Sequence, residues 1–326
     1  MYNQGHCIHK CLRSIQNQLF KNIEIIIIDD CSLDNSTEII ESYQKEDDRI
    51  ILMKHESNEG KIKSRTDGIK ISKGKYILII DGDDALIHKN ILTNSLYIAN
   101  LADLDVVEYK ASYYRKGEFK GNVNNYKYIN ITDIVYQPEL RTKFFYTKDN
   151  VSIRGIQNRS IWGKLIKNKI FQQAIINIGS KYTEDYIQTY EDTIMVVAIY
   201  QVAQSYYLMK QVGYYYSRDE FSNRLPFQKN KKCKPNRKIK KIGQLKLLEF
   251  LIEKTRNNEL ERQMLYHEII SINYYSKLVR VINCQFDIIY NIFNTLINCQ
   301  FISIKQKQML KLLKSQLQHN KKKFNL

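Results

Sequence analysis

Residues 76–84 read Tyr-Ile-Leu-Ile-Ile-Asp-Gly-Asp-Asp, a run of five apolar residues that ends abruptly in three carboxylates around one glycine. The apolar run is too short for a helix and apolar on both faces, which is typical of a buried strand in a parallel sheet. We therefore expect 76–80 to be a strand whose carboxyl end presents Asp81, Asp83 and Asp84.

The same pattern occurs upstream, where the apolar run 24–29 ends in Asp29 and Asp30. Strand patterns alternate with helical spacing through the first hundred residues, with helices expected over 7–19, 34–43 and 61–72 and a further strand over 50–53. This alternation predicts an α/β fold with a mostly parallel sheet and helices on both faces. Such sheets bind ligands at the carboxyl ends of their strands, so both acidic clusters should lie along one edge.

Further along the chain the pattern weakens and then returns. We expect a strand over 105–109, a weaker region with an edge hairpin over 110–181, a helix from Glu191, short strands over 206–209 and 212–216, and helices throughout 242–318. The sequence predicts a main domain over 1–227, with halves 1–109 and 110–227, then a basic linker over 228–241 and a helical extension over 242–326.

Composition and charge place the chain among folded globular proteins. Its 326 residues are 43% hydrophobic and include only 12 Gly and 3 Pro, which excludes collagen-like and linker-dominated chains. The net charge of +17 is uneven, because residues 1–100 carry −2, residues 101–226 carry +4 and residues 227–326 carry +15. The basic charge therefore belongs to the C-terminal region.

Several function classes are excluded by what the sequence lacks. The six cysteines form no C-x-x-C pair, so neither a zinc site nor a disulfide framework is expected. No apolar run approaches the roughly 20 residues that a membrane helix needs, and no signal peptide pattern opens the chain. We expect a cytoplasmic protein, with peripheral contact at an anionic membrane surface favoured by the charge of 229–241.

The pair Asp81 and Asp83 is the first candidate for chemistry. Residues i and i+2 that leave an extended strand project to the same side and can hold one ion. Two carboxylates with open coordination positions suit Mg²⁺ or Mn²⁺, completed by substrate phosphates. An isolated D-x-D is a weak signal, but its place after a buried strand, on the same edge as Asp29 and Asp30, favours a metal site.

Ordered motifs over about two thirds of the chain resemble glycosyltransferase family 2, the inverting nucleotide-sugar transferases of the GT-A type. The resemblance runs from Tyr2 to about residue 224. Its landmarks are Tyr2-Asn3-Gln4, the segment Ile26 to Ser36 that is similar to V-D-D-G-S-T-D-N-S, Asn58-Glu59-Gly60, Ser64-Arg65-x-x-Gly68, Gly74-Lys75-Tyr76-Ile77 through Asp84, Trp162-Gly163-Lys164-Leu165, Tyr190-Glu191-Asp192 and Tyr214-Tyr215-Tyr216-x-Arg218.

The resemblance implies a role for each matching residue. Tyr2 and Arg65 would contact the donor, with Arg65 beside its diphosphate, and Asp30 would accept a hydrogen bond from the nucleobase. Asp81 would contact ribose or metal, and Asp83 would be the main metal ligand. Asp192 would be the base that accepts the acceptor hydroxyl's proton. The expected reaction moves a hexose from a UDP-linked donor to an acceptor hydroxyl, with Mn²⁺ or Mg²⁺ as cofactor.

The sequence departs from the family at three places. The family has an apolar strand and a proline before the Tyr-Asn step, whereas this chain begins at Met1-Tyr2, so the resemblance predicts a sheet without that inner strand. Cys31 stands where the motif has glycine, and Asp67 adds an acidic group after Arg65. The missing strand predicts reduced stability or weaker UDP binding, and the changes at Cys31 and Thr66-Asp67 predict reduced activity.

Some alternatives stay open. Glu184-Asp185 is a second acidic pair that competes with Asp192 for the role of base, and Trp162 suits the core as well as a sugar-stacking platform. His55 and His88 are lone histidines near the acidic edge. The competing function is a non-catalytic GT-A-like module in which the basic C-terminal region holds an anionic partner; nucleic acid is not expected as that partner.

Overall fold

The computed structural model describes residues 1–115, 118–122, 133–140 and 159–217, with short stretches and single residues between 243 and 315. The chain divides into two compact units, one formed by 1–144 with 157–243 and the other by 145–156 with 244–326. The predicted linker 228–241 lies outside the described residues. The predicted domain boundaries therefore stay a prediction.

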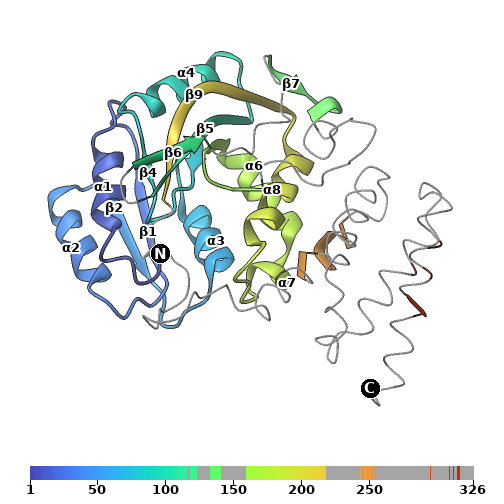
Figure 1. Cartoon of the computed structure of the whole chain (residues 1–326), viewed down its shortest axis with the longest axis horizontal. Helices are drawn as coiled ribbons and strands as arrows, with labels where there is room; N and C mark the ends of the chain where they lie inside the picture. The colour runs from blue at the N-terminus through green and yellow to red at the C-terminus, as the bar shows by residue number, and fades with distance from the viewer. Residues whose placement is uncertain are drawn as a thin grey trace. The chain divides into compact units, whose positions relative to one another are not determined.

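The first unit begins with alternating helices and strands, as the hydrophobic pattern predicts. Its elements up to residue 101 are α1 (Ile8–Gln16), β1 (Ile25–Asp29), α2 (Ser36–Glu46), β2 (Ile50–Lys54), α3 (Lys61–Ile71), β3 (Tyr76–Leu78), β4 (Ala85–Leu86) and α4 (Ile91–Leu101). Figure 1 shows α1 and α2 beside the β1–β2 pair, with α3 next to β1.

The second half of this unit is longer in strand and closes with helices. Its elements are β5 (Val106–Arg115), β6 (Glu118–Asn122), β7 (Val135–Tyr136), β8 (Lys164–Lys167), α6 (Asn168–Ile178), α7 (Ser180–Thr183), α8 (Glu191–Val202) and β9 (Ser205–Ser217). β5 and β6 form the expected hairpin. The two short strands expected over 206–209 and 212–216 are one continuous strand, β9. Its pairing with β5 shifts register beside Tyr109 and Lys110, and the strand is not interrupted there.

The described strands form two separate sheets. β1 and β2 pair in parallel, and a seven-stranded sheet has the order β3-β8-β5-β9-β4, with β6 on β5 and β7 on β9. The two longest ladders, β1–β2 and β5–β9, are parallel, and the shorter ones are antiparallel. The predicted α/β class is confirmed.

Two apolar clusters stabilise the unit. One lies under β5, β8 and β9, where Val107, Tyr109 and Tyr214 are fully buried beside Trp162. The other lies between α1, α2 and the β1–β2 pair and includes Leu12 and Ile40. Within the described part of the chain, no helix is both long and apolar enough to cross a bilayer.

Candidate active site

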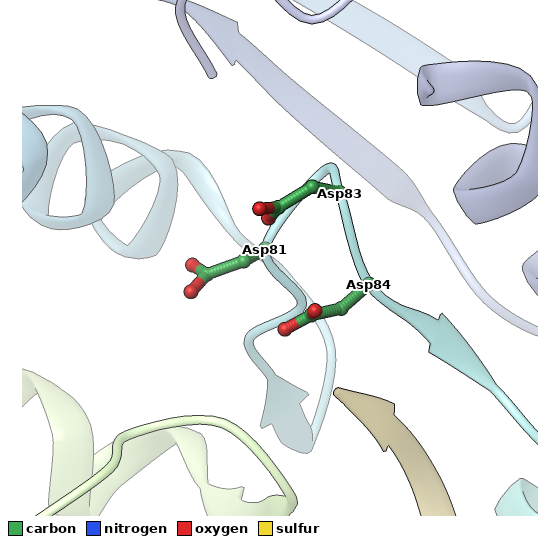
Figure 2. A group of neighbouring side chains, drawn as sticks. All are labelled: Asp81, Asp83 and Asp84. Atoms are coloured by element: carbon green, nitrogen blue, oxygen red, sulfur yellow. The ribbon is translucent and has the colours of Figure 1, made fainter. Parts of the chain in front are cut away.

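The turn after β3 gathers the three carboxylates that the sequence singles out. Asp84 N donates to Asp81 O at 2.9 Å, which closes a four-residue turn before β4. Oxygens of Asp81, Asp83 and Asp84 lie within 4.8 Å of one another, and Figure 2 shows the three side chains leaving the turn toward the same side. A Cβ at Gly82 would approach Oε1 of the buried Gln4 to 2.1 Å, so a larger residue there would have to displace that side chain.

The three carboxyl groups differ in their electrostatics. Burial, followed by the charge of Asp81, raises the pKa of Asp83 to about 6. Burial and both neighbouring carboxylates raise the pKa of Asp84 well above its ordinary value, although Asp84 accepts hydrogen bonds from Tyr214 Oη at 2.7 Å and Ser217 N at 2.8 Å. Burial would also raise the pKa of Asp81, but the positive charges of Arg65 and Lys61 outweigh it and lower that pKa.

Arg65, near the middle of α3, joins the turn Asp81–Asp84 to Asp192, the predicted base. Its Nη2 donates to Asp81 Oδ1 at 2.9 Å, and its Nη1 donates to Asp192 Oδ1. Burial opposes the charge of the guanidinium, but the surrounding carboxylates prevail and raise the pKa of Arg65 further. One buried cation thus positions two carboxylates from different elements, because Asp192 lies in the first turn of α8.

Glu191 adds a further acidic group beside Arg65. Its Oε1 lies 3.7 Å from both Lys61 Nζ and Arg65 Nη1. Burial and the charge of Asp192 raise the pKa of Glu191 to about 7. Burial is the largest cause of the raised pKa values of Asp83, Asp84 and Glu191, and the charges of neighbouring carboxylates add to it.

Asp30 organises the loop between β2 and α3. Its Oδ1 accepts from Glu59 N and its Oδ2 from Gly60 N, at 2.8 and 2.9 Å, and His55 Nδ1 lies 2.8 Å from Oδ1. Gly60 has φ +88, a left-handed conformation that favours glycine, and it directly precedes α3. This loop fixes where α3 begins and hence where Arg65 lies.

Asp29 and Cys31 have structural roles here. Asp29 accepts from Ser32 N at 3.1 Å and from the Thr37 hydroxyl, so it closes the turn after β1. Cys31 has φ +64, which explains in physical terms why the family motif has glycine at this step.

A cavity of about 1410 Å³ is lined by residues of both acidic clusters. Its lining includes Tyr2, Asp30, Arg65, Asp81 and Asp83. The structure therefore brings together the residues predicted for donor and metal. Asp192 does not line this cavity, but it is joined to the same cluster through Arg65.

The family model for glycosyl transferase family 2 matches residues 1–173, more than half of the chain. The chain belongs to this family. It is 29% identical over 198 residues to glycosyltransferase GlyG of Streptococcus pneumoniae serotype 4, covering 57% of this chain and 60% of GlyG. It is 28% identical over 273 residues to the uncharacterized glycosyltransferase YibD of Escherichia coli K12, covering 82% of this chain and 72% of YibD. The chain thus spans less than two thirds of GlyG.

The fold agrees with solved structures. The structure of S. aureus TarS 1-349 in complex with UDP-GlcNAc matches this chain with a TM-score of 0.65 at 16% identity. The match covers 98% of this chain and 87% of the TarS chain. The likeness is one of fold, and it confirms the predicted GT-A type.

Three other residues singled out from the sequence of this family 2 chain are Trp162, Glu184 and Arg218. Trp162 stacks on Tyr214 with ring centroids 4.7 Å apart and is 6% exposed, so it belongs to the core. Glu184, from the competing acidic pair, contacts Lys63 at 3.3 Å and Lys70 at 3.6 Å rather than Arg65. Arg218 lies outside the described residues.

Three features of this family 2 site were not predicted from the sequence. His55, discounted as a lone histidine, bridges Asp30 and Asp67, with Nε2 3.3 Å from Asp67 Oδ2. Asp67 pairs with Lys63 at 2.6 Å and does not line the cavity, so its negative charge is compensated within α3. The hydrogen bond from Tyr214 to Asp84 spans 130 residues, and only the fold brings these groups together.

Proposed function

We propose that this chain is an inverting glycosyltransferase that moves a hexose from a UDP-linked donor to an acceptor hydroxyl, with a divalent cation held at Asp81 and Asp83. The observation that carries the proposal is the contact of Arg65 with both Asp81 and Asp192. It joins the turn suited to a cation and diphosphate to the carboxylate suited to a proton transfer. Transfer from a nucleotide sugar needs positive charge beside the leaving diphosphate and a base beside the acceptor hydroxyl.

The residues of the turn suit a divalent cation. Carboxylate oxygens are the ligands that Mg²⁺ and Mn²⁺ prefer, and here they lie within 4.8 Å of one another. Burial and then the charge of Asp81 raise the pKa of Asp83, so a bound cation would favour its ionised form. A bound cation would supply positive charge for the departing diphosphate. Asp83 and Asp81 are the proposed ligands, and Asp84 is held by Tyr214 and Ser217.

Asp192 is the proposed base. Its Oδ1 is held by Arg65, and Ile161 N donates to its Oδ2 at 3.4 Å, so the carboxylate has a fixed position. In the proposed step Asp192 takes the proton of the acceptor hydroxyl while the hydroxyl oxygen bonds to the anomeric carbon. The bond from that carbon to the diphosphate breaks on the opposite face, and the configuration inverts. Arg65 stabilises negative charge on the leaving group.

The donor end of the proposal rests on Asp30, which lines the cavity together with Tyr2. Asp30 Oδ2 accepts one backbone bond, from Gly60, and a carboxylate oxygen can accept a second bond from a nucleobase N–H. UDP is the proposed nucleotide because the family resemblance implies it. TarS, which shares the fold, was determined with UDP-GlcNAc, and this supports the choice.

The test is UDP release from a panel of UDP-hexoses, measured with Mn²⁺ and with chelator. We expect release with Mn²⁺ that the chelator abolishes. Asp192→Asn should keep UDP binding and lose turnover by a factor of order 10²–10⁴, because the amide cannot take a proton. Asp48→Asn, at an exposed position, is the matched control. If Asp192→Asn remains active while Asp185→Asn does not, the base is in the competing pair.

A further inference from the structure

Lys164 places a charged group in the core at a position where stability alone does not explain it. It is the first residue of β8, its side chain is fully buried, and it lies opposite Glu108 of β5, with Nζ 3.4 Å from Glu108 Oε2. Tyr206 Oη donates to the same carboxylate oxygen at 3.0 Å. Well-packed apolar residues often replace such a buried pair with no loss of stability. The contacts of the lysine amine therefore point to another role.

The amine of Lys164 is bonded to the backbone beside the proposed base. Lys164 Nζ donates to Ser160 O at 2.6 Å, which is a short hydrogen bond for a nitrogen donor. Burial lowers the pKa of Lys164, and the charges of Glu108 and Asp192 oppose that shift. Asp192 is thus one of the carboxylates whose charge acts on this amine, although the two residues belong to different elements.

The peptide between Ser160 and Ile161 links the lysine to the proposed base. This peptide bond is trans, so its C=O and its N–H point in opposite directions. On one side Ser160 O accepts from Lys164 Nζ, and on the other Ile161 N donates to Asp192 Oδ2 at 3.4 Å. Consecutive hydrogen bonds in a buried site polarise and strengthen one another. The amine therefore orients this peptide and strengthens its bond to the carboxylate.

The segment that carries this peptide is held against the sheet at two further points. Gly163 has φ +73, a left-handed conformation that favours glycine, and its carbonyl accepts from Tyr109 N of β5 at 3.0 Å. Trp162 stacks on Tyr214 of β9. The peptide therefore has a fixed place relative to the sheet, and its N–H can define where the carboxylate of Asp192 lies.

Asp192 is held at both of its oxygens by different parts of the fold. Arg65 donates to Oδ1, and Ile161 N donates to Oδ2. The terminal torsion of an aspartate is broad, so a carboxylate held at one oxygen can rotate. Bonds to both oxygens fix the plane of the carboxylate. Because a base must lie within hydrogen-bond reach of the proton that it takes, loss of this orientation lowers the rate of transfer.

We propose that Lys164 is a positioning residue for Asp192 and acts through the peptide between Ser160 and Ile161. The inference rests on the proposed function, in which Asp192 is the base, and it adds to that function a residue outside the cavity. Lys164 does not line the cavity that holds Asp81 and Asp83. Removing its amine should therefore lower turnover and leave UDP binding unchanged.

The test compares the double variant Lys164→Met/Glu108→Leu with Lys167→Met, each in the full chain. The double variant removes the amine together with its counter-ion, so that the fold keeps most of its stability. Lys167 is the matched control, because it is a buried lysine of the same strand with its own carboxylate partner, Asp105 Oδ1 at 3.3 Å. UDP release from the UDP-hexose panel with Mn²⁺ measures turnover, calorimetry measures UDP affinity, and NMR measures hydrogen exchange at the Ile161 amide.

The double variant should lose roughly tenfold to a hundredfold in turnover, keep its UDP affinity, and exchange the Ile161 amide roughly tenfold faster. Lys167→Met should keep both the turnover and the protection of Ile161. Equal turnover in the two variants would overturn the proposal, and so would a loss of UDP affinity as large as the loss of turnover. If the unaltered chain releases no UDP, the proposed function fails. Unchanged protection of Ile161 in the double variant would then overturn the positioning role independently.

Discussion

The paired strands β8 and β3 differ sharply in how deeply their side chains are buried. On β8, Leu165 and Ile166 are 4% and 0% exposed, and the strand lies between β3 and β5. On β3, Tyr76, Ile77 and Leu78 are all only partly buried, although their residue types are equally apolar. The difference comes from their neighbours, since β8 has a strand on each side and β3 has a strand on one side only.

This contrast teaches where stability and function lie. The β5–β8–β9 region is closed, and Lys164 and Glu108 form an ion pair inside its core. The β1–β3 region holds the open cavity and the acidic turn with its raised pKa values.

The largest effect is expected at the ion pair buried in the closed region. Lys164 Nζ lies 3.4 Å from Glu108 Oε2, and both side chains are fully buried. Lys164→Met should lower the free energy of unfolding by about 3–5 kcal/mol, because it leaves a buried carboxylate without its cation. Urea denaturation measures this.

The matched control is Lys54→Met, which removes an exposed pair with Glu41 and should cost at most about 1 kcal/mol. Adding Glu108→Leu to Lys164→Met should restore much of the loss. Equal costs for the two lysine variants would contradict the description of the closed region.

The next prediction compares directly opposed residues. Ile166 of β8 pairs with Ile77 of β3, and only Ile166 is fully buried. Ile166→Ala should cost about 2–5 kcal/mol of unfolding free energy, and Ile77→Ala less than half of that, since a partly exposed side chain loses less burial. If both variants lose the same stability, β3 is as well packed as β8.

The acidic turn should be destabilising without metal. Asp83 has a folded-state pKa of about 6, above its ordinary value, so ionisation above that pH costs the folded state free energy. Asp83→Asn removes the charge and should stabilise the metal-free chain at pH 7.5 by about 1–2 kcal/mol, a figure reduced because the group is partly exposed to solvent. Thermal unfolding with chelator measures it; a lower melting temperature for Asp83→Asn would count against the electrostatic account.

The smallest expected effect is a pH dependence of cation binding. A proton and a cation compete for Asp83, so Mn²⁺ affinity should rise as pH increases from 5 to 7 and level off above its pKa of about 6. Calorimetric titration with Mn²⁺ across this range measures the dependence. Asp48→Asn should keep the dependence, and an affinity that does not change with pH would contradict the role of Asp83.

Much of this was predictable from local sequence. The runs ending at Asp29–Asp30 and Asp81–Asp84 predicted two strands followed by carboxylates, because short apolar runs and carboxylates are local signals. Asp30, Asp81 and Asp83 do line one cavity, but β1 and β3 belong to separate sheets rather than to one sheet edge. The contact of Arg65 with Asp192 spans 127 residues and depends on how α3 and α8 are placed, so no spacing rule reveals it. The same holds for His55 with Asp30, where a single histidine carries no pattern.

The central claim is that Asp83 holds the cation that supports donor binding. Isothermal titration calorimetry of UDP, with Mn²⁺ and with chelator, tests it most directly on the unaltered chain, Asp83→Ala and Asp48→Ala. The account predicts Mn²⁺-dependent UDP binding in the unaltered chain and Asp48→Ala, and none in Asp83→Ala, because no neighbour replaces the lost charged oxygen. Unchanged Mn²⁺-dependent affinity in Asp83→Ala would contradict it.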